Sequence, residues 1–268
     1  MTLDMSAPLR VERAGPGGHT AVIVLNRPAR GNAFTSSMRA MMVDAWTLVR
    51  TDDSIRCVVV TGTGDRHFCT GVDVAEVAKT GRGTAGDGPA AEEIVWSPFS
   101  GPVWKPVVCA LNGLVAGGGL HFVADADIVV AASHVELLDP HVSIGMAGAV
   151  ESVGLSHRMP LGAALRMTLC GRHYRMPAER AHQLGLVDEV VDRTELMPTA
   201  MAIASQICEN SPSAVRVSKR TIWESIGRSR ADSAEYAWAL ARSQFAHPDV
   251  AEGAAAFTER RQPQWMES

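Results

Sequence analysis

Continuous runs of β-branched and apolar residues constrain the fold of this chain more than any other feature. Residues 19–25 (HTAVIVL) and 55–61 (IRCVVVT) read as strands buried on both faces, as in parallel sheets. Between them, apolar residues recur at steps of three and four over residues 38–49, which predicts an amphipathic helix capped by Ser36 or Ser37. The order strand, helix, strand predicts a βαβ crossover.

Two further buried runs, residues 107–111 and 128–131, extend the strand pattern. The glycine-rich segment 81–89 predicts either a mobile surface loop beside a site or a plain linker. From about residue 161 the strands give way to helices, whose apolar stripes suggest an oligomer interface. The predicted helices cover residues 161–169, 177–184, 195–210, 213–226, 231–246 and 250–261.

Composition narrows the class of protein. The 268 residues carry 25 basic and 29 acidic side chains, and the net charge of −4 argues against a nucleic-acid partner. No apolar run approaches the ~20 residues that cross a bilayer, so we expect a cytoplasmic protein without a membrane partner. The five cysteines form no CxxC pair, which favours buried small side chains over a zinc or redox site.

Two glycine-containing turns carry the most chemical information. Residues 112–122 (NGLVAGGGLHF) follow a predicted strand, and their three consecutive glycines let the backbone approach a ligand closely and aim amides at it. Alone, such a turn fits a phosphate cradle or a packing turn equally well. Residues 67–74 (HFCTGVDV) form a second turn after another strand. The backbone amides of two turns at the ends of neighbouring strands can point toward one oxygen atom of a ligand.

These turns make the chain resemble the crotonase (enoyl-CoA hydratase/isomerase) superfamily. The resemblance runs nearly end to end and includes LNRPARGNAF (25–34), ADADI (124–128), LCGR (169–172), AHQLGLVDEVV (181–191) and AFTERR (256–261). It implies an α/β fold of the ClpP/crotonase type, a spiral of repeated ββα units over residues 1–195. Residues 196–268 would form a C-terminal helical trimerisation region, giving a homotrimer or a dimer of trimers.

The resemblance also implies the substrate, an acyl-CoA thioester, with coenzyme A entering as part of the substrate and no permanently bound cofactor. The thioester oxygen would lie between the amides of Val72 and Gly118. Negative charge builds on that oxygen as an enolate forms, and loss of one preorganised donor costs on the order of 3 kcal/mol. The implied CoA-contacting residues are Arg27, Pro28, Ala29, Val72, Asp73, Val74, Gly117 and Gly118, with Lys219, Phe257 and Arg260 as weaker candidates.

The chain departs from the family where catalysis is expected. Typical hydratases use two glutamates, but alignment on the glycines puts His121 at the first position and His141 at the second. An insertion of one residue would place Glu151 where some relatives carry an acid, and Asp139 could orient a nearby imidazole. Each of these side chains either faces the acyl pocket or has a structural role. Their spacing does not require a metal ion.

Three functions therefore stay open. The leading one is a hydratase or isomerase reaction in which some subset of His121, His141 and Glu151 moves protons. The second is hydrolysis of a CoA thioester, or retro-Claisen cleavage of a β-diketone, with histidine as base. The third is a catalytically silent protein that only binds acyl-CoA. Trp96, Phe99 and Trp104 suggest an apolar wall for the acyl group.

Overall fold

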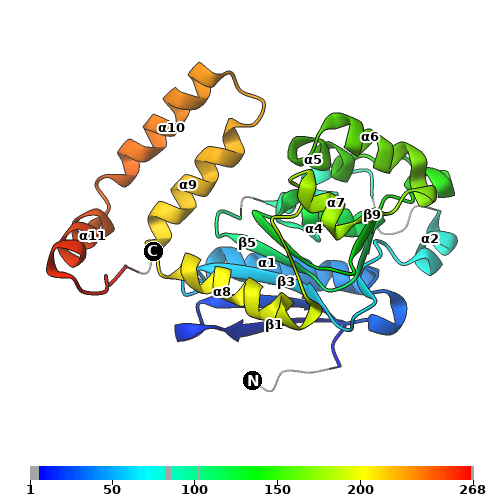
Figure 1. Cartoon of the computed structure of the whole chain (residues 1–268), viewed down its shortest axis with the longest axis horizontal. Coiled ribbons are helices and arrows are strands. Elements are labelled where there is room, and N and C mark those ends of the chain that lie inside the picture. The colour runs from blue at the N-terminus through cyan, green and yellow to red at the C-terminus, as the bar shows by residue number, and fades with distance from the viewer. Residues whose placement is uncertain (1–5, 82–85, 102, 267–268) are drawn as a thin grey trace.

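The computed structural model describes residues 6–81, 86–101 and 103–266, and contains two sheets flanked by helices (Figure 1). Residues 82–85 of the predicted glycine-rich loop lie outside the described residues. The larger sheet has six strands in the order β1-β2-β3-β5-β7-β10. They are β1 (Leu9–Ala14), β2 (Thr20–Leu25), β3 (Cys57–Gly62), β5 (Val107–Leu111), β7 (Ile128–Ala132) and β10 (Glu189–Val191).

The predicted central strands are all present. β2, β3, β5 and β7 run parallel, and their runs of valine and isoleucine are almost wholly buried, as the unbroken apolar patterns indicated. Three of the five cysteines, Cys57, Cys69 and Cys109, lie in this core, as predicted, whereas Cys208 is half-buried and Cys170 exposed.

Two strands of the larger sheet were not predicted. β1 pairs antiparallel with β2 at one edge, and β10 pairs parallel with β7 at the other. Strands therefore continue beyond the point where the sequence suggested helices alone.

The crossover helix α1 (Ser36–Thr51) joins β2 to β3, but the predicted cap is wrong. The side chain of Thr35 accepts a hydrogen bond from the Met38 amide, while Ser36 is already helical. The hydroxyl of Ser36 instead donates to Glu76 Oε2 at 2.8 Å. The serine pattern thus placed the helix start within two residues but chose the wrong hydroxyl.

A smaller sheet positions the two glycine turns. Its order is β4-β6-β8-β9, from β4 (His67–Cys69), β6 (Leu114–Ala116), β8 (Glu136–Leu138) and β9 (Met176–Pro177). Because β4, β6 and β8 are parallel, their carboxyl ends meet at one edge of the sheet. The short helices α2 (Val74–Thr80), η4 (Gly117–Gly119) and η5 (His141–Ile144) follow that edge, with α4 (Leu120–Asp125) after η4.

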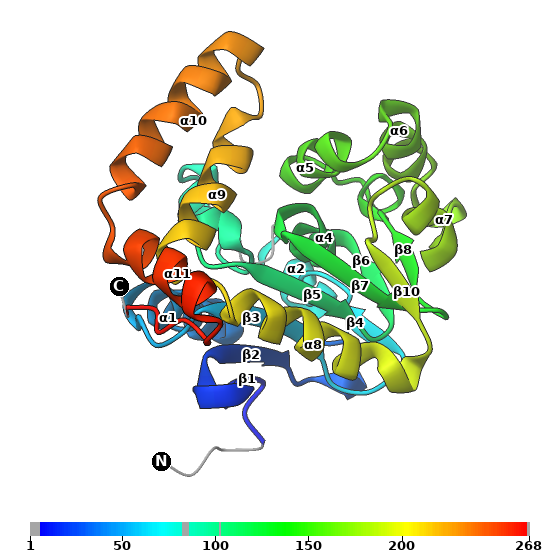
Figure 2. The ribbon, with the colours of Figure 1, turned by 60° about the vertical axis from the view of Figure 1, so that its left-hand side comes forward.

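The remaining helices fall into two groups. α5 (Val150–Arg158), α6 (Leu161–Cys170) and α7 (Ala178–Gln183) lie beside the smaller sheet, with α5 packed on α4. α8 (Leu196–Cys208) packs across β3, β5 and β7, whereas α9 (Pro212–Ser225) and α10 (Arg230–Gln244) project from the sheets as a pair (Figure 2). α11 (Pro248–Glu259) completes the six helices predicted from residue 161 onward. Within the described residues, each helix is too short or too polar to traverse a lipid bilayer.

Candidate active site

The two glycine turns cross at the edge of the smaller sheet, at a separation that only glycine permits. Gly71 has φ +86°, and a Cβ built on it would lie 2.7 Å from the amide nitrogen of Gly118. A Cβ on Gly119 would collide with the carbonyl of Cys69. Side chains at these two positions would push the turns apart, so the glycines fix the approach of one backbone to the other.

This crossing places the amides of Val72 and Gly118 side by side. The Phe34 amide donates to the Gly71 carbonyl and the Asp73 amide donates to the Phe34 carbonyl, both at 2.8 Å. Because amides alternate in direction along an extended segment, the Val72 N–H faces away from Phe34 and toward η4. A Cβ on Gly118 would lie 3.9 Å from the Val72 nitrogen. The Val72 nitrogen therefore lies next to Gly118, at the point where the two turns cross.

A cavity of about 250 Å³ opens beside this pair of amides. Its wall brings Val72, Gly117 and Gly118 together with His121, His141 and Glu151, so the residues predicted for catalysis share one cavity. The rest of the wall is largely apolar and includes Val77, Ile94, Trp96, Ile144, Met146 and Val150.

His141 begins η5 and is held through one ring nitrogen. Its Nδ1 lies 2.7 Å from Asp139 Oδ1 and 3.1 Å from Glu151 Oε1. Its Nε2 lies 3.7 Å from the position of a Cβ on Gly117, beside the glycine turn. Burial would lower the pKa of His141, but the hydrogen bonds and charges of the two carboxylates outweigh it and raise the pKa to about 9. His141 is thus an imidazolium at neutral pH.

Glu151 bridges two imidazoles from the first turn of α5. Its Oε1 meets His141, and its Oε2 lies 3.3 Å from His121 Nε2. Burial would raise the pKa of the Glu151 carboxyl, but hydrogen bonds from both imidazoles hold it well below its usual range. Although 94% of its surface is buried, this glutamate stays ionised because each of its oxygens meets an imidazole that donates a hydrogen bond to it.

His121 lies on α4 and is almost fully buried. Its Nδ1 lies 3.7 Å from Asp125 Oδ2, within ion-pair range but too far for a hydrogen bond, and finds no hydrogen-bond partner among the described residues. Burial lowers the pKa of His121, but Asp125 and Glu151 together raise it above the ordinary value. The hydroxyl of Ser97 donates to Asp125 Oδ2 at 2.5 Å.

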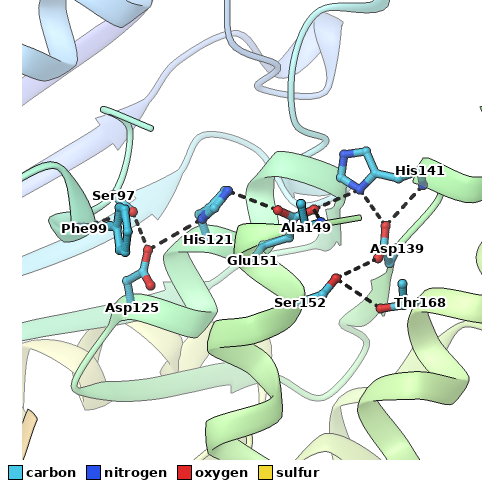
Figure 3. Close-up of polar contacts among 10 residues, drawn as sticks. All are labelled: Ser97, Phe99, His121, Asp125, Asp139, His141, Ala149, Glu151, Ser152 and Thr168. Carbon is cyan, nitrogen blue, oxygen red and sulfur yellow. Dashed lines mark hydrogen bonds and ion pairs between the residues drawn. The ribbon is translucent and has the colours of Figure 1, made fainter. Parts of the chain in front are cut away.

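Five side chains therefore alternate acid and base through the site, as Figure 3 shows. We call Asp125, His121, Glu151, His141 and Asp139 the carboxylate–imidazole chain. The suggested role of Asp139 in orienting an imidazole fits the 2.7 Å contact with His141. Sequence reasoning missed Asp125, although its spacing of four residues from His121 on a helix was a readable signal.

Three residues of the carboxylate–imidazole chain also have the side-chain types that bind metal ions. Ligand atoms of Asp139, His141 and Glu151 lie within 4.8 Å of one another. The short contacts to Nδ1 are equally those of charge-assisted hydrogen bonds, which need no ion. The prediction that the site works without a metal stays a prediction.

The segments predicted to bind CoA lie next to one another. Arg27 Nη2 lies 3.0 Å from Asp73 Oδ2, and Arg27 Nη1 donates to the carbonyl of Ala33. This ion pair ties the turn of η2 (Pro28–Arg30) to the turn that carries Val72. Pro28, Ala29 and Val74 are exposed there.

The weaker candidates for CoA contacts have other surroundings. Lys219 Nζ lies 2.7 Å from Asp127 Oδ2 and donates to the Lys105 carbonyl at 3.0 Å. Phe257 is 88% exposed on α11, and Arg260 caps that helix with φ +54°.

The three aromatic residues proposed for the acyl wall divide between two cavities. Trp96 lines the cavity of the site, whereas Phe99 and Trp104 line another cavity beside Lys219.

Comparison with known proteins agrees with this geometry. Residues 17–268 match the family described as Enoyl-CoA hydratase/isomerase. A mevalonyl-coenzyme A hydratase from Aspergillus fumigatus is 34% identical over 263 residues, covering 94% of this chain and 93% of the relative. A carnitinyl-CoA dehydratase from Proteus mirabilis is 30% identical over 264 residues, covering 92% and 95%. The crystal structure of an enoyl-CoA hydratase/isomerase from Mycobacterium paratuberculosis superposes with a TM-score of 0.87 at 35% identity, covering 98% and 99%.

The chain belongs to the enoyl-CoA hydratase/isomerase family. The predicted family and the crotonase fold are confirmed, and the protein is an acyl-CoA-processing enzyme.

Proposed function

We propose that this enzyme adds water to, or removes water from, the bond between the α- and β-carbons of an acyl-CoA thioester. One observation carries the proposal: the Nε2 edge of the His141 imidazolium lies beside the glycine turn that holds the Gly118 amide. A proton donor and a site for an oxyanion thus face the same small volume. The names of the related hydratases and dehydratases support a reaction of this class.

In this proposal the amides of Val72 and Gly118 bind the thioester carbonyl oxygen. When water attacks the β-carbon, electrons move through the double bond onto that oxygen and form an enolate. The amides are already oriented by the crossing of the two turns, so they stabilise the new charge without rearranging. Such donors contribute on the order of 3 kcal/mol each to the transition state.

His141 completes the proton balance at one nitrogen. Its Nε2–H gives a proton to the α-carbon of the enolate, and the neutral imidazole takes a proton from the water now bound to the β-carbon. The substrate gains one water, and His141 returns to its protonated form. Asp139 and Glu151 both contact Nδ1, so His141 exchanges protons with the substrate at Nε2.

The charge state of His141 separates this proposal from hydrolysis with histidine as base. A histidine that starts the reaction as a base must be neutral, whereas a pKa of about 9 leaves His141 protonated at neutral pH. Silent acyl-CoA binding would gain nothing from five buried or part-buried ionisable groups, which cost free energy to desolvate. We therefore favour a proton-donating imidazolium over both alternatives.

The proposal includes the binding of CoA at the turn tied together by Arg27 and Asp73, and assembly into a homotrimer or a dimer of trimers. Support for assembly comes from large apolar side chains that lie exposed on α9, α10 and α11. Ile222, Trp238 and Phe257 are 68%, 52% and 88% exposed. A second copy of the chain would cover them, and light scattering after size-exclusion chromatography measures the state directly.

Mass spectrometry of products from a panel of enoyl-CoA, β-hydroxyacyl-CoA and β-ketoacyl-CoA thioesters tests the reaction. Gain or loss of one water with CoA still attached is the expected result. Free CoA or a cleaved carbon chain would refute the proposal. The variant His141→Gln should bind acetyl-CoA as the wild type does but lose turnover, whereas His134→Gln, at an exposed position, serves as the matched control.

A further inference from the structure

His121 occupies an unusual place in the carboxylate–imidazole chain, because both of its ring nitrogens face protein carboxylates. Nε2 faces Glu151 at 3.3 Å and Nδ1 faces Asp125 at 3.7 Å. The side chain is 4% exposed, and its ring lies edge-on to Trp96 with centroids 5.8 Å apart. His121 therefore offers no nitrogen to a substrate, although it forms part of the cavity wall.

Glu151 connects His121 to His141, whose Nε2 lies beside the glycine turn. One oxygen of its carboxylate meets His121 and the other meets His141. When both imidazoles are protonated, the two cations on opposite oxygens of one carboxylate repel each other, and each makes the other easier to deprotonate. In a site that excludes water this repulsion is weakly screened.

We propose that His121 is a positioning residue that acts through Glu151: it holds the shared carboxylate in place and, when protonated, limits how tightly His141 keeps its proton. The kinetic consequence rests on the proposed function, because it requires that His141 give up and regain a proton in each turnover. Without this repulsion His141 would hold its proton more tightly and transfer it to carbon less readily.

The ionisable groups around the two imidazoles come from three parts of the fold. Asp125 lies on α4 with His121, Glu151 lies on α5, and Asp139 precedes η5. The neutral hydroxyls of Ser97, Ser152 and Thr168 complete the surroundings, with Ser152 donating to Asp139 Oδ2 at 3.4 Å. Among the described residues, the charged groups bonded or ion-paired to either imidazole are the three carboxylates of the chain.

Two substitutions act in different ways on the charge that His121 can carry. In His121→Gln the amide nitrogen replaces Nε2 as a donor to Glu151, so the hydrogen bond remains and the charge is lost. In Asp125→Asn the imidazole remains, but the carboxylate that helps keep it protonated is gone. The second variant keeps the test available if the first does not fold, and His134→Gln again serves as the control for altered surface charge.

The experiment follows the titration of His141 by nuclear magnetic resonance in protein with isotope-labelled histidine, the signal being assigned by its loss in His141→Gln. We expect His121→Gln to move the midpoint upward by about one pH unit, and Asp125→Asn to move it in the same direction by less. The pH limit of turnover should move with the midpoint.

An unchanged midpoint, or one moved to lower pH, overturns the inference. If the midpoint moves as expected but the pH limit of turnover does not move with it, the coupling is supported and the proposed function is refuted. The inference and the proposed function can therefore fail separately.

Discussion

The sharpest prediction concerns the rate above neutral pH. If the His141 imidazolium gives a proton to the substrate, kcat must fall as rising pH deprotonates His141 in the population of enzyme molecules. The pKa of His141 is raised from 6.5 to about 9 because Asp139 and Glu151 both contact Nδ1. A shift of that size corresponds to about 3 kcal/mol in favour of the protonated form.

The size of the fall follows from this pKa. About nine-tenths of the enzyme carries the proton one unit below the midpoint and about one-tenth one unit above it, so kcat should decrease about tenfold from pH 8 to pH 10. Between pH 6 and pH 8 the rate should hardly change, because the imidazolium is already formed. An unperturbed histidine would place the same fall near ~6.5.

The assay is the initial rate of loss of the ultraviolet absorbance of a conjugated enoyl-CoA, in buffers of constant ionic strength and corrected for alkaline thioester hydrolysis. His134→Gln should reproduce the wild-type profile because His134 is exposed and its ring contacts the carbonyl of Asp65. A rate that rises from pH 8 to pH 10 would refute the reasoning. It would identify neutral imidazole as a base, which is the requirement of the hydrolase alternative.

Three further predictions use the same geometry. Gly118→Ala should fold, since its Cβ meets only ordinary contacts, but the methyl group beside the Val72 amide should lower kcat/KM by about 10²-fold. Gly71→Ala should instead lose thermal stability, because residue 71 has a strained φ of +86°. Asp139→Asn should move the alkaline limit of kcat down by at least about one pH unit, because a carboxylate that stabilises the His141 imidazolium is gone. Urea titration should show that the contribution of His141 to the free energy of unfolding is largest below about pH 6.5, the pKa of histidine in the unfolded chain. That contribution, up to about 3 kcal/mol, should be lost as pH rises through 9, and His141→Gln should not show this pH dependence.

Burial explains which strands the sequence revealed. β2, β3, β5 and β7 are covered on both faces, so their side chains form unbroken apolar runs. β1 pairs only with β2, and its sequence LRVERA alternates apolar and charged residues over four positions before Glu12 and Arg13 break the pattern, which is too short to stand out. β10 has three residues, one of them exposed. Edge strands depend on pairing with a neighbour, which a single-sequence pattern does not record.

The site was only partly readable for a related reason. The resemblance pointed to His121, His141 and Glu151 one by one, but their contacts arise where α4 packs against α5 and where η5 leaves β8. Those contacts depend on helix packing and on the turn between η5 and α5, which brings Glu151 back toward His141. The spacing of Asp125 and His121 was visible along the sequence, whereas the bridging position of Glu151 was not.

The chain of alternating charges explains why its members must act as a set. The resemblance implies glutamates where His121 and His141 stand, and a buried imidazole there could carry a proton only at high cost without a nearby counter-ion. Glu151, Asp125 and Asp139 supply such counter-ions. Restoring glutamate at both histidine positions while Glu151 remains would place three carboxylates together and force at least one to bind a proton. The two introduced glutamates, sharing a proton with Glu151, would then not have the same charge as the glutamate pair of typical hydratases. The double replacement should therefore leave the enzyme inactive unless Glu151 is also neutralised.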